Sequence, residues 1–235
     1  MAIITADSLL KLSPHMKLER AEPYAQALDA CLSHADINTP LRIAHFMAQV
    51  THECMGFKAL AESFKYSASG LLATFPKIVG TPTRAHILAN LPPDQLADFL
   101  YGDRADLGNT QSGDGYRFIG RGFIMLTGRF NYTACAKRTG LPLTDHPELL
   151  QEPEAAALAA ADYWATNKIN EAADRDNVRD VTRLINSALL GLPDRTSNLA
   201  IAKKIWVAGI PVSSSASDSR ASPPVINPEP TPSAP

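Results

Sequence analysis

The feature of this 235-residue chain that most restricts its fold is one glycine-rich segment set among helical windows. Residues 102–130 contain seven glycines with several Asp, Asn and Ser residues, and a loop of that length inside a compact domain is often functional. Elsewhere the apolar residues recur with a helical period. The sequence therefore predicts a mainly α-helical domain with one long loop and at most a small β-hairpin around FIMLT. The helical windows lie at about residues 21–34, 40–56, 67–75, 83–90, 93–101, 131–139, 152–166, 176–190 and 195–207.

Local signals mark several of the expected helix ends. Thr39 followed by Pro40 is typical of a helix start, and Ser67 stands at the same position before the next window. Pro153 suits a first helical turn, and Gly140 after AKRT is typical of a helix stop.

The end of the chain differs in composition from the rest. Residues 211–235 are dominated by Pro, Ser and Ala and hold seven of the 18 prolines. Such a segment cannot bury enough apolar surface to offset the entropy of ordering. We expect one globular domain over residues 1–210 and a disordered tail over residues 211–235.

Composition excludes several classes of function. The chain has 22 Lys+Arg against 24 Asp+Glu, which argues against a nucleic-acid binder, because such domains usually carry a basic face. No window of 18 apolar residues predicts a membrane span, so no membrane insertion is expected. Three widely spaced cysteines, Cys31, Cys54 and Cys135, predict buried thiols rather than a disulfide framework. The first residues lack a basic start and an uninterrupted apolar run, so we expect synthesis in the cytoplasm without a signal peptide.

Glu53 is the first candidate for acid–base chemistry. Residues 43–57 read IAHFMAQVTHECMGF, and Glu53 is the only formal charge among them. A carboxylate on so apolar a helix is expected to be desolvated, which raises its pKa and suits a general acid. The alternative is a core glutamate held by a neighbouring Arg or His.

Glu62 follows nine residues later, and two carboxylates at one site are the minimum for hydrolysing a glycosidic bond. On one continuous helix the two would be separated by roughly 13 Å and point to opposite sides. They converge only if the helix breaks, and Gly56 is the natural break. Near Lys58 and Lys65 we expect Glu62 to be hydrated and ionised, as a general base is; the alternative is a solvated surface glutamate.

Two apparent motifs fail on inspection. A zinc motif of the H-E-x-x-H type would need histidine where Gly56 stands, and a dinucleotide fingerprint starting at Gly120 would need glycine where Met125 stands. We therefore predict no metal site and no cofactor. Arg121, between two glycines, is expected to neutralise a carboxylate.

Three stretches together resemble glycoside hydrolase family 19: AHFMAQVTHECMGF, AESFKYSASGLLATFP and GDGYRFIGRGFIMLTGRFNY. The later stretch DVTRLINSALLGLPDR is similar to the family's Ile-Asn-Gly-Gly segment and following Arg. The likeness runs from about residue 35 to residue 205. The family contains chitinases and peptidoglycan-cleaving bacteriophage endolysins. The compact length, the small number of cysteines and the segment LLATFPK resemble the endolysins more than the plant chitinases.

This resemblance implies a lysozyme-like helical fold and an inverting mechanism. By position it implies that Glu53 is the general acid, that Glu62 is the general base, and that Thr127 helps to hold the attacking water. It also places Asn131 and Asn186 at sugar-contacting positions, and Arg195 at a position that supports the carboxylates and the substrate site. Without the resemblance, Thr127 reads as an ordinary strand threonine and Asn186 as a helix cap.

The sequence departs from the family at two places. Met125 stands where the family usually has Gln, which removes a polar sugar or water contact, and Ser187-Ala188 replace the Gly-Gly pair. The acid, base and hydroxyl positions are retained, so we still expect activity.

Three functions follow as hypotheses. The first is an endolysin-type lysozyme that cuts the glycan strands of peptidoglycan, reaching the cell wall after release by a separate factor. The second is a chitinase with the same mechanism. The third is a sugar-binding module without catalysis, suggested by Met125. A monomer is expected in each case, with a glycan as the partner.

Overall fold

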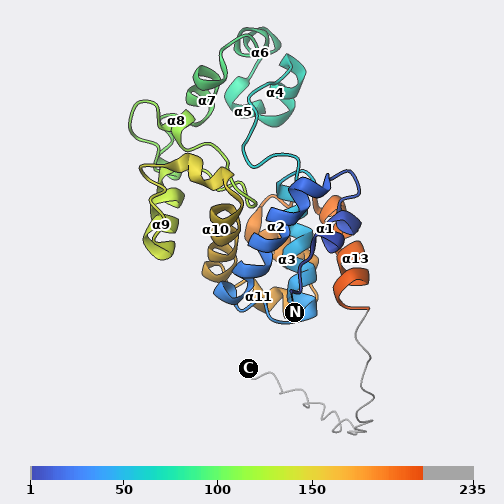
Figure 1. The fold of residues 1–235 in the computed structure, drawn as a ribbon. Coiled ribbons are helices and arrows are strands. Elements are labelled where there is room, and N and C mark those ends of the chain that lie inside the picture. The colour runs from blue at the N-terminus through green and yellow to red at the C-terminus, as the bar shows by residue number, and fades with distance from the viewer. Residues whose placement is uncertain (1, 209–235) are drawn as a thin grey trace, which may run out of the picture.

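The computed structural model describes residues 2–208, so the tail expected at 211–235 lies outside the described residues. Residues 2–208 are mainly helical and form no β-strand, which confirms the predicted fold class (Figure 1). The elements are α1 (Ala6–Leu12), α2 (Leu18–Cys31), η1 (Leu32–Ala35), α3 (Pro40–Glu53), α4 (Ala68–Thr74), α5 (Pro76–Val79), α6 (Pro82–Leu88), α7 (Pro93–Tyr101), η2 (Ala105–Leu107), α8 (Asp114–Arg117), α9 (Arg129–Thr139), η3 (Pro147–Gln151), α10 (Pro153–Thr166), α11 (Asn170–Asp174), α12 (Val178–Ile185) and α13 (Leu192–Trp206).

Helix α3 lies at the centre of the larger part of the molecule. Thr39 caps it by accepting a hydrogen bond from the Arg42 amide at 3.2 Å, and Pro40 occupies its first turn, as predicted. Every residue from 43 to 51 is buried, which requires neighbours on all sides of the helix. Helices α11, α12 and α13 pack against it, and the ring of Phe46 meets that of Trp164 on α10 edge-on at 5.3 Å.

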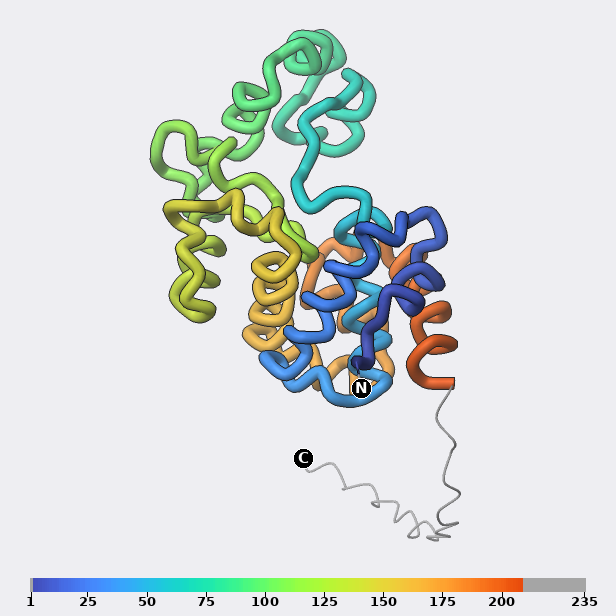
Figure 2. Tube along the Cα trace, in the orientation of Figure 1, coloured from blue at the N-terminus to red at the C-terminus, as the bar shows by residue number. Residues whose placement is uncertain are grey.

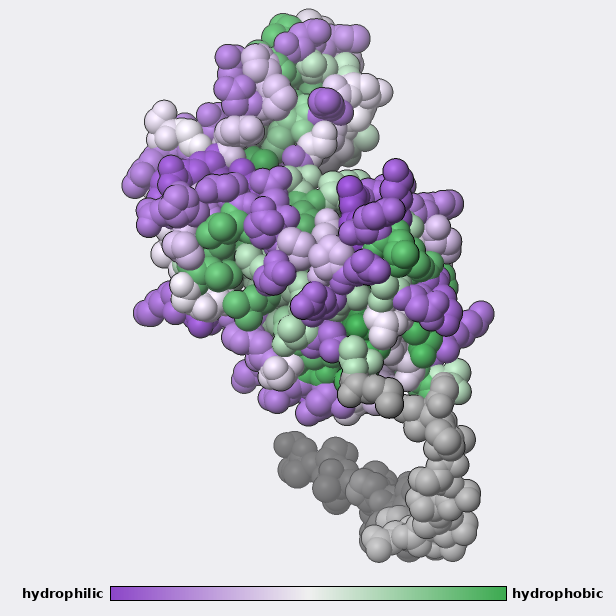
Figure 3. Space-filling view, in the orientation of Figure 1, coloured by the Kyte–Doolittle hydropathy of each residue, from purple (hydrophilic) through white to green (hydrophobic). Residues whose placement is uncertain are grey.

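Buried apolar side chains form two separate clusters. The larger one joins α1–α3 with α9–α13. The smaller one has nine buried residues and holds α4–α7 together, so we call residues 64–101 the small lobe. The small lobe lies at one end of the molecule in Figures 1 and 2, where α7 packs against α8, and the surface in Figure 3 is notched between the small lobe and the larger part.

The glycine-rich segment 102–130 folds as short turns rather than as a hairpin. It contains η2 and α8, and Arg121 and Leu126 exchange backbone hydrogen bonds of 3.1 and 2.8 Å around a tight turn. The small hairpin expected near FIMLT is reduced to this one pair. Gly115 shows why glycine is needed in the segment, because a Cβ there would lie 2.6 Å from the Asp98 Cα of α7.

Some boundaries differ from the predicted windows. Helix α3 ends at Glu53 instead of residue 56, because Met55, Gly56 and Phe57 all have positive φ angles of 52°, 68° and 63°. Four helices, α1, α5, α8 and α11, were not predicted. Each has seven residues or fewer, too short for a clear helical period.

The three cysteines lie in the protein interior with free thiols, as predicted. Burial raises the pKa of Cys31, Cys54 and Cys135 to about 12, so these thiols stay protonated and unreactive at neutral pH. Within residues 2–208, none of the helices has both the length and the apolar character needed to cross a membrane.

Candidate active site

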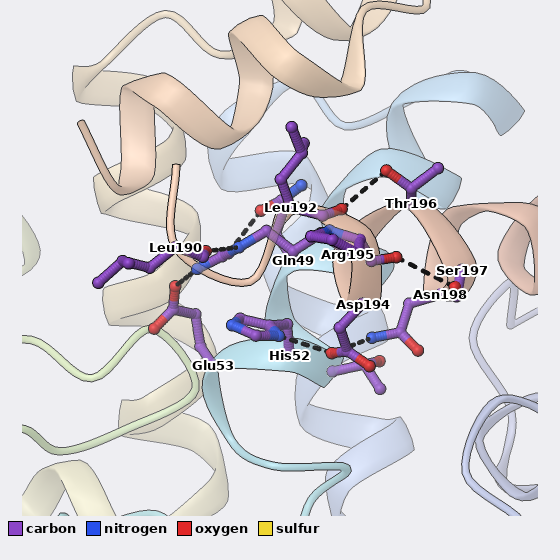
Figure 4. Close-up of polar contacts among 12 residues, drawn as sticks. Gln49, His52, Glu53, Leu190, Leu192, Asp194, Arg195, Thr196, Ser197 and Asn198 are labelled. Atoms are coloured by element: carbon purple, nitrogen blue, oxygen red, sulfur yellow. Dashed lines mark hydrogen bonds and ion pairs between the residues drawn. The ribbon is translucent and has the colours of Figure 1, made fainter. Parts of the chain in front are cut away.

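Glu53 is the last residue of α3 and is held by an arginine from the other end of the chain. Arg195 Nη2 donates to Glu53 Oε1 at 2.5 Å, and Arg195 Nη1 donates to Gln49 Oε1, one turn earlier on α3, at 2.6 Å (Figure 4). The Glu53 side chain is 16% exposed, while that of Arg195 is 1% exposed. Glu53 is therefore held by an arginine, as the alternative interpretation of the sequence expected, but its carboxylate is still partly exposed to solvent.

The start of α13 fixes Arg195 in this position. Gly191, with φ +74°, precedes the helix and lies so close to α3 that a Cβ on it would come within 2.2 Å of the His52 ring. His52 Nδ1 in turn bonds Asp194 Oδ2 at 2.6 Å (Figure 4). Arg195 Nε also donates to the Leu190 carbonyl at 3.2 Å, so the guanidinium is anchored on three sides.

Glu62 lies on the segment that returns from the break after α3. Its amide donates to the Gly120 carbonyl at 2.8 Å, which ties this segment to the glycine-rich one. Tyr101 Oη donates to Glu62 Oε1 at 2.8 Å. Burial raises the pKa of Glu62, while the hydrogen bond from Tyr101 and the Gly120 amide oppose that rise. The hydrated setting expected for Glu62 is found only in part: Glu62 is half-buried, and its carboxylate accepts hydrogen bonds from Tyr101 of the small lobe and from the Gly120 amide.

Gly120 stands between Glu62 and Thr127. A Cβ at position 120 would lie 3.2 Å from Thr127 Oγ1 and 3.3 Å from Glu62 Oε2, so both oxygens face the same small space. The Thr127 hydroxyl donates to the Met125 carbonyl at 2.9 Å, which leaves its lone pairs available to a water donor. Thr127 follows a tight turn, not a strand.

A pocket of about 270 Å³ brings most of the candidate residues together. Asn131 Nδ2, at the start of α9, donates to the Thr127 carbonyl at 2.8 Å, and Asn186 caps the end of α12 and accepts from the Leu190 amide at 3.3 Å. Met125 lines the pocket with φ +50°, a strained conformation for a non-glycine residue. The pocket is lined by Glu53, Leu107, Ile124, Met125, Leu126, Thr127, Asn131, Tyr163, Ile185 and Asn186.

Sequence comparison gives the family. No family model matches the chain. A protein of Haemophilus influenzae described as glycosyl hydrolase family 19 domain-containing is 34% identical over 170 residues, which cover 72% of this chain and 82% of that protein. The chain belongs to glycosyl hydrolase family 19.

Solved structures of family 19 enzymes share the fold. Chitinase C from Streptomyces griseus HUT6037 superposes with a TM-score of 0.60 at 20% identity, over 87% of this chain and 77% of that one. A bacterial family 19 chitinase superposes with a TM-score of 0.58 at 20% identity, over 86% of this chain and 93% of that one. These likenesses confirm the lysozyme-like helical fold expected for a family 19 chain.

Two tyrosines of this family 19 site were missed by sequence reasoning. Tyr101 bonds Glu62, and Tyr163 of α10 lines the pocket and donates to the Leu184 carbonyl at 3.1 Å. Burial and then the nearby Glu53 charge raise the pKa of Tyr163. Both lie in ordinary helical windows, so no local pattern distinguishes them. Tyr66, four residues after Glu62, could have been suspected from proximity; its pKa is raised to about 12 by burial and by Glu62.

The expectation that Arg121 neutralises a carboxylate is met only weakly: the pKa of Glu148 is lowered by its own backbone hydrogen bond, by His146 and, to the smallest extent, by the charge of Arg121. Among the described residues Arg121 forms no ion pair; its Nη1 donates to the Arg117 carbonyl at 2.8 Å and to Tyr132 Oη at 3.3 Å. Arg121 lines a different pocket, which also contains Arg117 and Arg129.

Proposed function

We propose that this family 19 chain is an endolysin-type lysozyme that cleaves β-1,4 glycosidic bonds of peptidoglycan by an inverting two-carboxylate mechanism. The observation that carries the proposal is the pocket shared by Glu53, Thr127, Asn131 and Asn186, with Glu62 facing Thr127 across Gly120. Two carboxylates on opposite sides of a scissile bond supply an acid and a base.

Glu53 acts as the general acid in this proposal. Arg195 occupies Oε1, so Oε2 is the oxygen that carries the proton to the leaving sugar. The fixed guanidinium orients the carboxyl group, and it stabilises the carboxylate that forms when the proton has left.

Glu62 acts as the general base that activates water. The raised pKa of Glu62 makes its ionised form a stronger proton acceptor, and the hydrogen bond from Tyr101 favours that ionised form. Water bound between Glu62 and Thr127 would donate to both oxygens. Inversion requires roughly 6.5–9.5 Å between the two carboxyl groups, to leave room for that water.

Asn131 and Asn186 are the proposed sugar contacts. Each uses one side-chain atom on the protein backbone, Nδ2 in Asn131 and Oδ1 in Asn186, so its other amide atom is available to a hydroxyl or acetamido group. Met125 offers an apolar contact where the family usually has an amide, which favours the apolar face of a sugar ring.

We choose peptidoglycan as the substrate because the sequence, including the segment LLATFPK, resembles endolysins. A chitinase remains the second candidate, because the solved structures that share this fold are described as chitinases. The two candidates share the mechanism and differ in the groups attached to the sugars.

Digestion of purified sacculi tests the proposal. We expect new reducing ends on N-acetylmuramic acid by mass spectrometry, and the first product in the α-anomeric form by NMR. Glu53→Gln and Glu62→Gln should each lower turnover by about 10²–10⁴-fold, while Glu22→Gln, at an exposed position of α2, should not. Full activity in Glu53→Gln would refute the acid assignment, and cleavage of colloidal chitin but not of sacculi would favour the chitinase.

A further inference from the structure

A second pocket, of about 460 Å³, shares no lining residue with the pocket of the candidate active site. Three arginines line it: Arg117 at the end of α8, Arg121 in the turn, and Arg129 at the start of α9. We call it the arginine pocket. None of these residues takes part in the proposed hydrolysis.

Arg121 carries a buried charge that has no carboxylate within ion-pair distance among residues 2–208, although the exposed Glu148 lies in the same pocket. It is 8% exposed, its Nη1 donates only to a carbonyl and a tyrosine hydroxyl, and its Nε is buried with no acceptor among the described residues. A buried cation without an anion is costly, and native proteins rarely keep an unpaired buried donor without a reason. An anion in the arginine pocket would offset this cost.

The other two arginines of the pocket, Arg117 and Arg129, differ in their partners. Arg129 is neutralised by buried Asp114, with Nε to Oδ2 at 2.8 Å and Nη2 to Oδ1 at 2.5 Å. Arg117 is exposed and donates only to the Thr144 and Asp145 carbonyls, at 3.0 and 3.1 Å. Arg117 and Arg121 therefore face the same pocket, and neither forms an ion pair among the described residues.

Two exposed carboxylates, Asp145 and Glu148, also line the arginine pocket. They would repel a multiply charged phosphate, but they would attract an ammonium group beside a carboxylate. The pocket thus suits a ligand that carries both groups. Peptide stems of peptidoglycan that contain a diamino acid have this character, with free carboxylates and a free ammonium group.

We propose that the arginine pocket binds a carboxylate of the peptide stem while the glycan occupies the active site. This inference rests on the proposed function. The same short stretch lines both pockets: Arg121 and Arg129 face the arginine pocket, whereas Leu126, Thr127 and Asn131 face the active site. A stem of four residues extends at most about 14 Å, enough to pass over one turn of chain.

Calorimetric titration of the intact protein with the tetrapeptide released from sacculi by an amidase tests this site without requiring hydrolysis. We expect binding to wild type and a loss of about tenfold in Arg117→Gln, the loss expected for one charge-assisted hydrogen bond. Arg121→Gln should lose at least as much affinity, provided that circular dichroism shows the variant to be folded. If Arg121→Gln does not fold, the result for Arg117→Gln, at an exposed position, decides the test. Arg175→Gln, which removes an exposed charge at the end of α11 and outside the arginine pocket, should bind as wild type does.

Two further ligands identify the chemistry. The same tetrapeptide with its carboxyl groups converted to amides should bind at least tenfold more weakly, and so should acetate or inorganic phosphate. Unchanged affinity in Arg117→Gln, no tetrapeptide binding, or equal affinity for acetate would each overturn the proposal. Because binding is measured directly, a chain that binds the stem but does not cut sacculi would refute the proposed function and not this site.

Discussion

At the scale of single residues, Glu53 and Glu62 are held by opposite means. Glu53 has a buried cation as its partner, whereas Glu62 has only neutral donors, a tyrosine hydroxyl and a backbone amide. The cation stabilises charge on Glu53 directly, while the surroundings of Glu62 leave part of its desolvation uncompensated. The two carboxyl groups are thus distinguished by their partners.

Glu62→Gln should stabilise the folded protein at neutral pH while lowering turnover by about 10²–10⁴-fold. The raised pKa means that the folded state binds the Glu62 proton more tightly than the unfolded state does, so stability is lost as pH rises through the folded pKa. Replacing Glu62 with the neutral Gln removes the ionised carboxylate and with it this loss of stability. We expect a higher Tm than wild type at pH 7 and little change near pH 3, where the carboxyl group is protonated in both states.

Thermal unfolding at the two pH values measures this effect. Glu22→Gln is the control, since Glu22 is exposed and should give equal Tm changes at both. If the Glu62→Gln protein were less stable than wild type at pH 7, Glu62 would not be a desolvated carboxylate.

At the scale of elements, the junction of α3 with the start of α13 determines the geometry around Glu53. Gly191 allows this close approach because it adopts a positive φ and has no Cβ to meet the His52 ring. Arg195 follows one turn later and reaches Glu53. A change at Gly191 therefore acts on the carboxyl group through the helix.

Gly191→Ala should destabilise the protein by about 2–4 kcal/mol and lower turnover at least tenfold, since both the left-handed backbone and the collision with His52 must be relieved. Gly140→Ala is the matched control, because Gly140 has φ +77° but nothing within 4 Å of a Cβ. It should cost only about 1 kcal/mol. Chemical denaturation and reducing-end assays measure both quantities, and equal effects of the two substitutions would contradict the role of the His52 contact.

Sequence periodicity was enough to predict the long helices and several of their ends. Thr39, Ser67, Gly140 and Pro153 lie at the predicted caps or first turns, because cap chemistry is local. The short helices were missed because their stability comes from tertiary packing. In the site, the resemblance supplied the positions, and the structure brings them to one region. The partial burial of Glu62 and the lack of an ion pair at Arg121 among the described residues could not be predicted. Both depend on which distant segments of the chain pack against these side chains.

At the scale of the whole molecule, the two apolar clusters make the small lobe a separate unit of stability. Eight of the nine buried residues of the smaller cluster lie in the small lobe, among them Leu96, which is 1% exposed. Because local stability follows the buried apolar contacts of each unit, amides in the small lobe should exchange faster than those of α3 and α13.

Leu96→Ala should widen this difference by destabilising the small lobe by about 2–5 kcal/mol. Native-state hydrogen exchange should then accelerate over residues 68–101, with little change in α3. The opening also removes Tyr101 from Glu62, so turnover should fall as exchange rises. Equal acceleration in both parts would show that they unfold as one unit.

The ion pair between Glu53 and Arg195 joins residues 142 positions apart. During synthesis the ribosome therefore completes α3 and the whole small lobe long before the partner of Glu53 exists. A nascent or prematurely terminated chain that stops before α13 carries the glutamate but not the guanidinium that orients it. The cell that makes this protein is thus exposed to the assembled site only after α13 has been translated.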